Sequence, residues 1–419
     1  MDGVQPTPEL LLTLLDPTTR ANPYPAFTRI RQAGPLALPE SDLVVFSSYA
    51  DCDESLRHPS SCTDRLKSTI TQRAIAAGMP ARPFGTPGFL FLDPPDHTRL
   101  RRLVSKAFSP RVVKALEPEI TRMVADLLDQ TDRTAEVCLA DEVDCSGAVD
   151  LIATLAHPLP VMVICRLLGV PVEDEPQFRW ASSVLAQALD PFIALTGEAH
   201  GAEKHLEAGT WLRGYLNALL QKRRDHPGDD LMSALIAIED VGDALTEDEI
   251  VATCNLLLIA GHETTVNLIA NAALAMLREP QHWAALSRDP QLAGPVLEET
   301  LRYDPPVQLT MRIAGADMRV GDTWVKTGDS MLLLLAAAHR DPQVTVRPDA
   351  FDPARSAIKH LAFGIGAHFC LGAPLARMET AVALSALTQR YPNARLAAEP
   401  VYKPHVTLRG MESLLVLRN

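Results

Sequence analysis

The chain is predicted to be mainly α-helical with a small β-rich part, and three features of its 419 residues indicate this. A helical pattern begins at His97–Phe108, and helices dominate from there to Leu301. The segment Thr246–Leu277 alone would form one helix of roughly 45–50 Å, because each residue adds about 1.5 Å. Short β-type pieces follow Pro305, and the first third of the chain mixes strands and helices.

The elements before and within the helical region have recognisable boundaries. Leu36–Ser47 predicts a β-hairpin, and Pro59–Phe91, rich in Gly, Pro, Ser and Thr, predicts a long, mobile loop with one helical segment. In the long helix, Thr246 and Glu249 form a capping box, and Pro280 lies just past the predicted end. These signals mark where the long helix begins and ends.

Shorter pieces follow the helical region. The runs MRIAG (311–315) and DMRVGDTWVKTG (317–328) have a strand-like composition, and Val406–Leu417 predicts strand and turn. Length alone would suggest two or three domains. No low-complexity linker, charge run or internal repeat divides the chain, however.

Composition and charge exclude several classes of protein. Hydrophobic residues make up 47% and charged residues 22%, as in ordinary soluble globular proteins. The net charge of −13 argues against nucleic acid as the main partner. The longest apolar runs, such as Met331–Ala338 and Leu256–Ala260, are too short to span a bilayer, and the polar start MDGVQPTPELLL offers no membrane anchor.

The seven cysteines indicate a reducing environment. They form no CxxC pair and no zinc-ligand spacing, their number is odd, and no secretory signal precedes them. We therefore expect a cytoplasmic protein.

One run, FGIGAHFCLG from Phe363 to Gly372, carries the most chemical information. Gly364 and Gly366 allow a tight turn with positive φ and the close approach of a large flat ligand. Cys370 follows at the mouth of a predicted helix, where free N–H groups favour a thiolate. A shielded thiolate in such a loop is suited to holding haem iron. The ordinary alternative is a buried structural cysteine beside a turn.

This run resembles the cysteine loop of the cytochrome P-450 family, the haem-thiolate monooxygenases, which is FGxGxHxCxG in soluble bacterial members. Every defined position is matched, and further family motifs follow in order over nearly the whole chain. The resemblance implies one domain, residues 1–419, with the cytochrome P-450 fold: a triangular, mainly α prism with a long central helix and a small β-rich lobe. It also implies haem b, bound by Cys370 and contacted by Phe363, Gly364 and Gly372.

A second motif, AGHETT at 260–265, lies inside the long helix. Glycine within a helix costs about 1 kcal/mol relative to alanine, and the small pair Ala260 and Gly261 leaves room for a flat ligand and a diatomic gas. Thr264 can turn its hydroxyl onto the carbonyl of Ala260, and Glu263 adds a carboxylate to an apolar segment. An ordinary Gly/Thr irregularity with an exposed glutamate is the alternative.

This motif is similar to the family's A-G-x-E/D-T, whose acid and threonine deliver protons during oxygen activation. The resemblance implies that Thr264 holds dioxygen and its water, that Glu263 relays protons from solvent, and that Ala260 and Gly261 contact the cofactor. His262 occupies a variable family position and receives no role.

Four further residues are expected to hold the cofactor. His97 and Arg101 share one face of a predicted helix, which could equally be a solvated surface. The resemblance implies that His97, Arg101, Arg312 and His368 bind the two haem propionates, for which an arginine fork is well suited. His368 is also expected to place a donor or cation beside the sulfur.

Glu299 and Arg302 lie three apart in EETLRYDPP, and alone they would predict a surface ion pair worth a few tenths of a kcal/mol. They look like the family's ExxR, completed by Arg355 in FDPARS. The resemblance implies a buried, architectural network beneath the cysteine loop, in which loss of one partner costs several kcal/mol.

The substrate pocket is expected to be largely apolar, which implies a lipophilic substrate held by area burial. The Pro59–Phe91 loop and a helical hairpin around Val184–Glu207 should contribute, although any one of these side chains could be plain core. The predicted lining residues are Phe89, Phe91, Leu256, Ile259, Val307, Leu309, Met311, Thr407 and Leu408.

Electrons should enter from the thiolate side. Arg102, Lys106, Arg111 and Arg377 could form a basic docking patch on an otherwise acidic protein, or be scattered surface charges. No flavin or iron–sulfur motif is present, so a separate ferredoxin and ferredoxin reductase are the expected donors.

The sequence therefore predicts a monomeric monooxygenase that hydroxylates or epoxidises a lipophilic small molecule. A peroxide-driven or non-oxygenating haem-thiolate enzyme is an alternative that would not need the Glu263–Thr264 pair. A haem-based sensor or binding protein is a third, from a different class.

Overall fold

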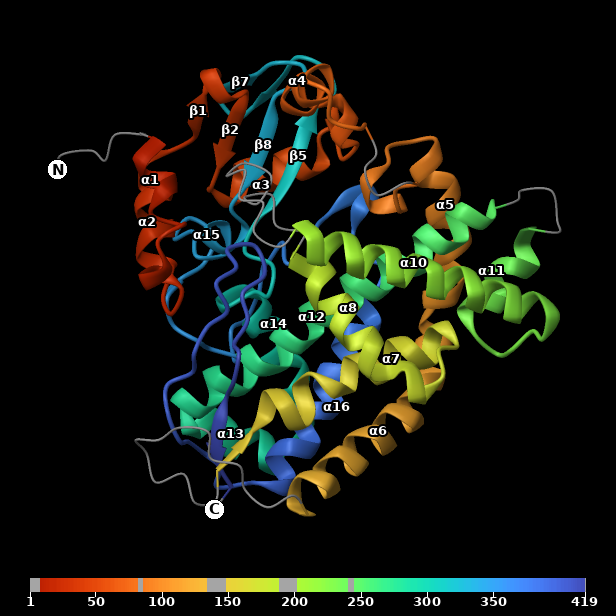
Figure 1. Ribbon diagram of the computed structural model, residues 1–419. Helices are drawn as coiled ribbons and strands as arrows, with labels where there is room; N and C mark the ends of the chain where they lie inside the picture. The colour runs from red at the N-terminus through yellow and green to blue at the C-terminus, as the bar shows by residue number, and fades with distance from the viewer. Residues whose placement is uncertain (1–7, 82–85, 134–147, 188–201, 240–244, 419) are drawn as a thin grey trace.

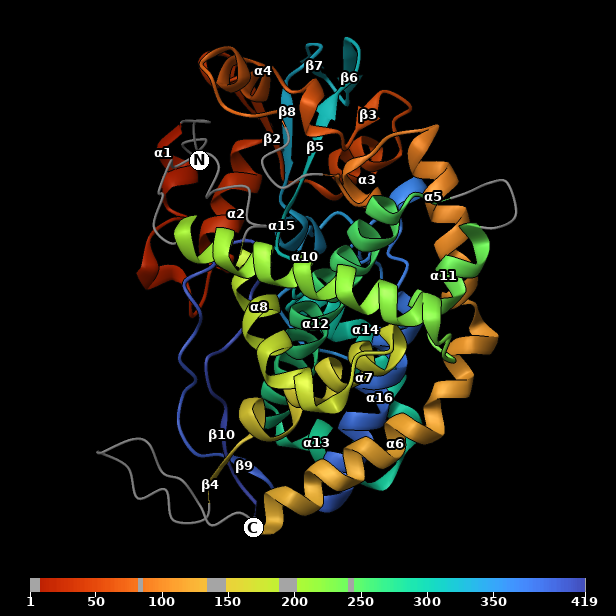
Figure 2. The same cartoon turned by 45° about the vertical axis from the view of Figure 1, so that its right-hand side comes forward.

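The computed structural model describes residues 8–81, 86–133, 148–187, 202–239 and 245–418. A large helical part carries a smaller part built around strands, as the sequence predicted (Figures 1 and 2). The described helices are α1 Pro8–Leu12, α2 Tyr24–Ala33, α3 Tyr49–Arg57, α4 Thr69–Ala76, α5 Asp96–Val104, α6 Pro110–Arg133, α7 Pro158–Leu168, α8 Glu175–Gln187, α10 Ala202–Asp225, α11 Leu231–Glu239, α12 Glu247–Arg278, α13 Pro280–Arg288, α14 Ala293–Tyr303, α15 Leu335–His339 and α16 Ala373–Arg390. The strands are β1 Leu36–Leu38, β2 Leu43–Phe46, β3 Ser61–Cys62, β4 Ala148–Asp150, β5 Thr310–Ala314, β6 Met318–Val320, β7 Thr323–Val325, β8 Ser330–Leu333, β9 Arg395–Leu396 and β10 Leu415–Leu417.

The long predicted helix, α12, runs through the middle of the helical part (Figure 2). It has 32 residues, a length of about 48 Å. The predicted capping box is present: the hydroxyl of Thr246 accepts from the N–H of Glu249 at 3.2 Å, and the carboxylate of Glu249 accepts from the N–H of Thr246 at 2.9 Å. Side chains on all sides of α12 are buried, which is the pattern of a helix enclosed by others.

Helices α7, α8, α10 and α16 pack directly against α12, and α16 also packs along α6. Together they bury the main hydrophobic core, which includes leucines such as Leu155, Leu212, Leu258 and Leu384. The cysteine loop leads into α16, so the core that fixes α12 relative to α16 also sets the distance between the AGHETT motif and Cys370.

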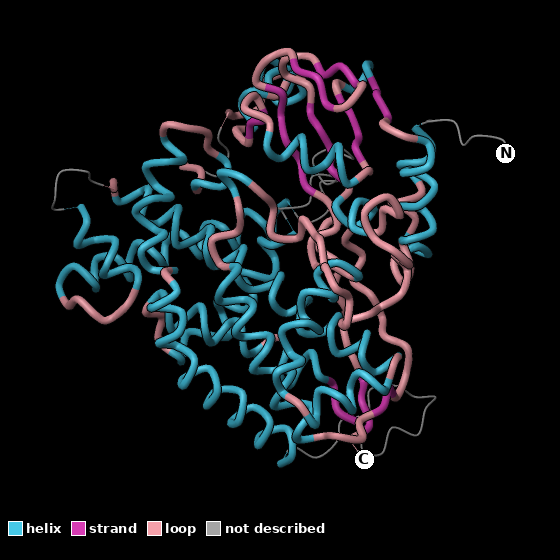
Figure 3. Tube along the Cα trace, turned by 180° about the vertical axis from the view of Figure 1, so that it is seen from behind, coloured by secondary structure: helices cyan, strands magenta, loops and turns pink. Residues whose placement is uncertain are grey.

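The strands gather at one end of the molecule, apart from a small second group (Figure 3). The larger sheet has the order β1-β2-β8-β5-β3, with β2 parallel to β8 and the other pairs antiparallel. The predicted hairpin is present, with Leu36 opposite Val45. Separate apolar clusters lie around this sheet, one of them including Phe27 and Leu332 and another Phe46 and Leu333.

Parts of the β structure differ from the prediction. Pro59–Phe91, expected to be a loop with one helical segment, also contains β3 and two 3₁₀ turns, Arg65–Lys67 and Phe89–Phe91. Strand β8 was not predicted individually, and all four of its residues are buried. A second sheet, β4-β10-β9, joins the C-terminal segment to the strand before α7.

Candidate active site

The cysteine loop (residues 363–372) closes on itself through a hydrogen bond from the backbone N–H of Cys370 to the carbonyl of Phe363, 2.8 Å. Gly364 and Gly366 have φ values of 66° and 75°, in the left-handed region that favours glycine. Cys370 lies three residues before Ala373, the first residue of α16. The turn and the helix mouth therefore lie where the sequence predicted them.

Opposing effects set the protonation of Cys370. Burial raises the pKa of its thiol, and this outweighs the N–H groups of Gly372 and Ala373 and the charges of Arg101 and Arg377, all of which lower it. The expected helix-mouth effect is therefore present, but it is too weak to produce the thiolate unaided. A coordinated metal ion deprotonates a thiol outright, so this sulfur suits a haem iron.

Three of the four predicted propionate ligands, Arg101, Arg312 and His368, line one largely apolar cavity. The fourth, His97, lies with its ring centroid 4.0 Å from that of His368. Arg101 donates to the backbone carbonyl of Phe369 in the cysteine loop. The structure thus brings together groups from α5, β5 and the loop.

The nitrogen atoms of this cluster have few hydrogen-bond acceptors around them. Nδ1 and Nε2 of His97 and Nδ1 of His368 are buried with no hydrogen-bond partner in the described chain. Arg312 is 8% exposed, and its hydrogen bonds in the described chain go to Thr310 and Met311 rather than to a carboxylate.

The pKa values of the same groups point in one direction. Burial lowers the pKa of Arg312 to about 10. Burial, with His97 and Arg312 nearby, lowers the pKa of His368 to about 3, which favours the donor over the cation among the two roles that the sequence suggested. A dianionic ligand would relieve this shortage of negative charge, and the two propionates of haem fit it.

The AGHETT part of α12 faces the same cavity. Ala260, Gly261 and Thr264 line it together with Cys370, and its volume is about 350 Å³. The hydroxyl of Thr264 donates to the carbonyl of Ala260 at 2.8 Å, the hydrogen bond expected from the sequence. A Cβ placed on Gly261 would approach only Ile164, at 3.7 Å, so protein packing does not require glycine there and space for a ligand is the remaining reason.

Glu263 was expected to relay protons from solvent, but its side chain is buried. It is 4% exposed, it does not line the cavity, and its Oε1 lies 2.6 Å from Nζ of Lys403. Burial alone would raise the pKa of Glu263, but Lys403, with His262 and His157, brings the pKa below its usual value. Lys403 could not be identified from the sequence, because it lies far along the chain and outside every motif.

The Glu299 network is buried, as the family resemblance implied. Arg302 and Glu299 are both 0% exposed and joined by two bonds of 2.7 and 2.8 Å, and Arg355 adds a third at 2.9 Å. Arg302 also donates to the carbonyls of Pro348 and Ala350. These hydrogen bonds fix residues 346–355, the segment that leads into the cysteine loop.

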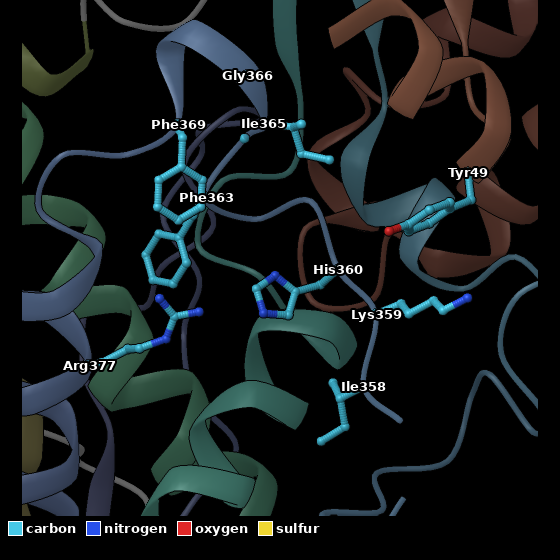
Figure 4. A pocket seen from close by; sticks show the side chains of 10 residues that line it. Tyr49, Ile358, Lys359, His360, Phe363, Ile365, Gly366, Phe369 and Arg377 are labelled. Atoms are coloured by element: carbon cyan, nitrogen blue, oxygen red, sulfur yellow. The ribbon is translucent and has the colours of Figure 1, made fainter. Parts of the chain in front are cut away.

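A second carboxylate, Glu298, holds the cysteine loop more directly, and the sequence analysis missed it. It accepts from Nε of Arg377 at 2.5 Å and lies 2.9 Å from Nε2 of His360. The guanidinium of Arg377 in turn lies 4.5 Å from the ring centroid of Phe363 (Figure 4). The glutamate doublet in EETLR was the available signal, since adjacent residues on a helix face different neighbours.

Most of the predicted substrate contacts meet in the cavity, whose lining is mainly apolar. The exception is Ile259, which packs against the helical core instead. Of the predicted hairpin around Val184–Glu207, residues 188–201 lie outside the described part of the chain. The predicted residues that do line the cavity are Phe89, Phe91, Leu256, Val307, Leu309, Met311, Thr407 and Leu408.

On the outer side of the cysteine loop, Arg377 lines a surface pocket of about 370 Å³ together with Tyr49, Lys359 and Phe369 (Figure 4). Arg102, Lys106 and Arg111, the other members of the predicted basic patch, are exposed on α5, the 3₁₀ turn after it, and α6.

Comparison with known proteins identifies the family. The family model for cytochrome P-450 matches residues 66–292 and 291–395. The vitamin D(3) 25-hydroxylase of Pseudonocardia autotrophica is 40% identical over 405 residues, which is 94% of this chain and 93% of that protein. The monooxygenase PikC of Streptomyces venezuelae is 38% identical, with 97% and 94% covered.

Among solved structures, Mycobacterium smegmatis CYP164A2 in its ligand-free state superposes with a TM-score of 0.89 at 62% identity, covering 98% of this chain and 99% of that one. Fold and site together define a haem-thiolate enzyme. The chain belongs to the cytochrome P-450 family and is a cytochrome P-450 monooxygenase. In the described part of the chain, no helix combines the length and the apolar character needed to cross a membrane.

Proposed function

We propose that the protein inserts one oxygen atom from O₂ into a lipophilic small molecule, by hydroxylation or epoxidation, using haem b. The observation that carries the proposal is one cavity that Cys370 enters from one side and Ala260, Gly261 and Thr264 from another. When bound, haem supplies the electron transfer and oxygen activation that amino-acid side chains lack.

Cys370 would be the axial ligand, with Phe363, Gly364 and Gly372 shaping the loop around it. His97, Arg101, Arg312 and His368 would hold the propionates. The unpartnered ring nitrogens of His97 and His368 support this role, because buried polar groups without partners are costly unless a ligand supplies them.

Thr264 would hold dioxygen and water through its hydroxyl, after turning from the carbonyl of Ala260. Glu263 would pass protons toward Thr264. This acid–threonine pair favours an oxygen-activating enzyme over a peroxide-driven or non-oxygenating one.

The apolar lining supports a lipophilic substrate, because burial of apolar area would supply most of the binding free energy. Similar proteins agree in class: solved structures include CYP267B1 of a myxobacterium in complex with myristic acid and CYP109E1 of Bacillus megaterium in complex with testosterone.

The electron donors would be a separate ferredoxin and its reductase, docking near Arg102, Lys106 and Arg111. A cytoplasmic location is part of the proposal, since the five cysteines within the described ranges form no disulfide with one another.

The first prediction tests the axial ligand. The ferrous–CO complex should show the red-shifted Soret band of thiolate ligation, and Cys370→Ala should abolish it because, among the described residues, no other cysteine lines the cavity. Absorption spectra of both purified proteins provide the measurement. A variant that keeps the band would show that another residue binds the iron.

Oxygen-dependent NADH oxidation with surrogate redox partners, together with product formation, separates an enzyme from a haem sensor.

A further inference from the structure

Lys403 lies outside every recognised motif, yet it contacts the buried acid of the central helix. Its Nζ lies 2.6 Å from Oε1 of Glu263, and the side chains are 19% and 6% exposed. Oε2 of Glu263 is buried with no hydrogen-bond partner in the described chain. The pair is therefore shielded from water, where removing one partner would leave an uncompensated charge.

A hairpin of the C-terminal segment, residues 401–412, holds Lys403 in place. The backbone N–H of Lys403 donates to the carbonyl of Gly410 at 3.0 Å. A Cβ on Gly410 would lie 2.0 Å from Oδ1 of Asn267, so this hairpin is seated tightly on α12. Lys403 is thus presented to Glu263 by a fixed backbone rather than by a mobile surface loop.

Glu263 is not positioned to serve Thr264 while this pair is closed. Thr264 lines the cavity and Glu263 does not. Two histidines also influence Glu263: His262, beside it on α12, and His157, at the start of α7, whose rings are 4.7 Å apart. The groups that face the carboxylate are therefore Lys403 from the hairpin, His262 from α12 and His157 from the α7 side.

We propose that Lys403 is a positioning residue that holds Glu263 as a carboxylate outside the cavity, and that proton delivery to Thr264 requires this ion pair to open. The inference rests on the proposed function. In the open state the carboxylate takes one proton from water on its solvent side and donates one to water or hydroxyl at Thr264. Glu263 then returns to its ionised form beside Lys403, so its charge is unchanged over the cycle.

Infrared difference spectra of the holoprotein test the ionisation of Glu263 without reference to turnover. In wild type and Lys403→Arg, both of which keep a cation, Glu263 should be ionised at pH 7. In Lys403→Met, burial acts unopposed, and the carbonyl stretch of a protonated carboxyl group should appear. That band should be absent from Lys403→Met combined with Glu263→Gln, which assigns it.

Oxygen-dependent NADH oxidation with surrogate ferredoxin and reductase gives the second readout. Lys403→Met should shift the alkaline limb of the pH profile, which reports loss of the donated proton, by about one pH unit or more toward alkaline pH and raise turnover at pH 7 several-fold. Lys403→Arg should match wild type. The matched control is Glu399→Gln, which breaks an exposed ion pair between the same C-terminal segment and Arg278 of α12, and should change neither readout.

Two outcomes would overturn the proposal. If Lys403→Met has the wild-type spectrum and pH profile, the pair does not control Glu263. If it is as slow as Glu263→Gln at every pH, Lys403 itself is needed in the closed pair. Both outcomes leave the thiolate-type ferrous–CO band intact, whereas loss of that band from the wild-type protein would overturn the proposed function itself.

Discussion

Thr264 presents one hydroxyl to the cavity, and removing it should affect oxygen chemistry rather than folding. Thr264→Ala loses a single hydrogen bond to Ala260, so haem content and the spectral response to ligands should persist. Product per NADH consumed should fall several-fold while peroxide rises, because the bound oxygen loses its proton-donating hydroxyl. Product, peroxide and NADH measured together check this.

The matched control for that prediction is Thr131→Ala on α6. Thr131 makes the same kind of hydrogen bond, to the carbonyl of Leu127 at 2.8 Å, but lies away from the cavity. Equal coupling in Thr264→Ala and wild type would remove Thr264 from the proton path.

Glu379 shows a different residue-level effect, on stability. It is 4% exposed on α16, and Oε2 has no hydrogen-bond partner in the described chain. Burial raises the pKa of this carboxyl well above 4.5. The folded protein therefore keeps a proton that the unfolded chain releases as the pH rises above 4.5. The contribution of Glu379 to the free energy of unfolding is fully present below pH 4.5, and it falls as pH rises by about 1.4 kcal/mol per pH unit at most.

We predict that Glu379→Gln flattens this part of the pH dependence and stabilises the protein at neutral pH. Denaturant unfolding of wild type and variant at pH 5 and pH 7.5 measures it, with the exposed Glu399→Gln as control. A variant that is destabilised equally at both pH values would mean that Glu379 is ionised or hydrogen-bonded in the folded protein.

Sequence reasoning at the residue scale worked where spacing along the chain encodes geometry. The pairs Glu299–Arg302 and Thr246–Glu249 are separated by three residues, and one helical turn brings each together. Lys403 could not be found in this way, because only packing of the C-terminal hairpin on α12 brings it to Glu263. The lowered pKa of His368 could not be predicted either, since it depends on burial and on charges from other elements.

At the scale of elements, the Glu299 network joins α14 to the segment that leads into the cysteine loop. Glu299→Ala would leave the buried guanidinium of Arg302 and that of Arg355 without their carboxylate, a loss of about 3–5 kcal/mol. We expect mainly insoluble apoprotein, measured as holoprotein yield from the absorbance ratio of haem to protein.

The control is an ion pair of the same spacing on the surface. Arg319 and Asp322 are 61% and 102% exposed, so Asp322→Ala should change the yield little. Normal holoprotein from Glu299→Ala would show that hydrogen bonds from Arg302 to backbone carbonyls suffice to hold the segment.

Elements whose boundaries are encoded in short stretches of sequence could be predicted, whereas strands that depend on their neighbours could not. The helix α12 has a capping box and a proline after its end, and hairpin β1–β2 has local pairing, so both are encoded in short stretches. Strand β8 lies in the middle of the sheet, and all four of its residues are buried. Its sequence therefore lacks the alternation of apolar and polar residues that marks a half-exposed strand. Strand β3 has two residues and forms only because β5 offers an edge to pair with.

At the scale of the whole molecule, the net charge of −13 makes the position of basic residues informative. Arg102, Lys106 and Arg111 are exposed on α5 and the beginning of α6, and Arg101 of the same helix contacts the cysteine loop. Arg377, by contrast, is occupied by Glu298 and belongs to the support of the loop. We propose that the exposed charges of Lys106 and Arg111 attract an acidic electron donor toward the thiolate side.

We therefore predict that Lys106→Glu combined with Arg111→Glu slows reduction by an acidic ferredoxin about tenfold or more at low salt, because steering of association depends on complementary charge. Near 1 M salt the Debye length falls to about 3 Å, and the difference from wild type should largely disappear. Stopped-flow reduction under CO at several salt concentrations measures both effects.

The control is Lys222→Glu, which reverses an exposed charge on α10. This variant should be reduced by ferredoxin at nearly the wild-type rate, which would show that a change in net charge does not by itself slow reduction. Equal rates for all three proteins at low salt would place the docking surface elsewhere, while leaving the haem site unaffected.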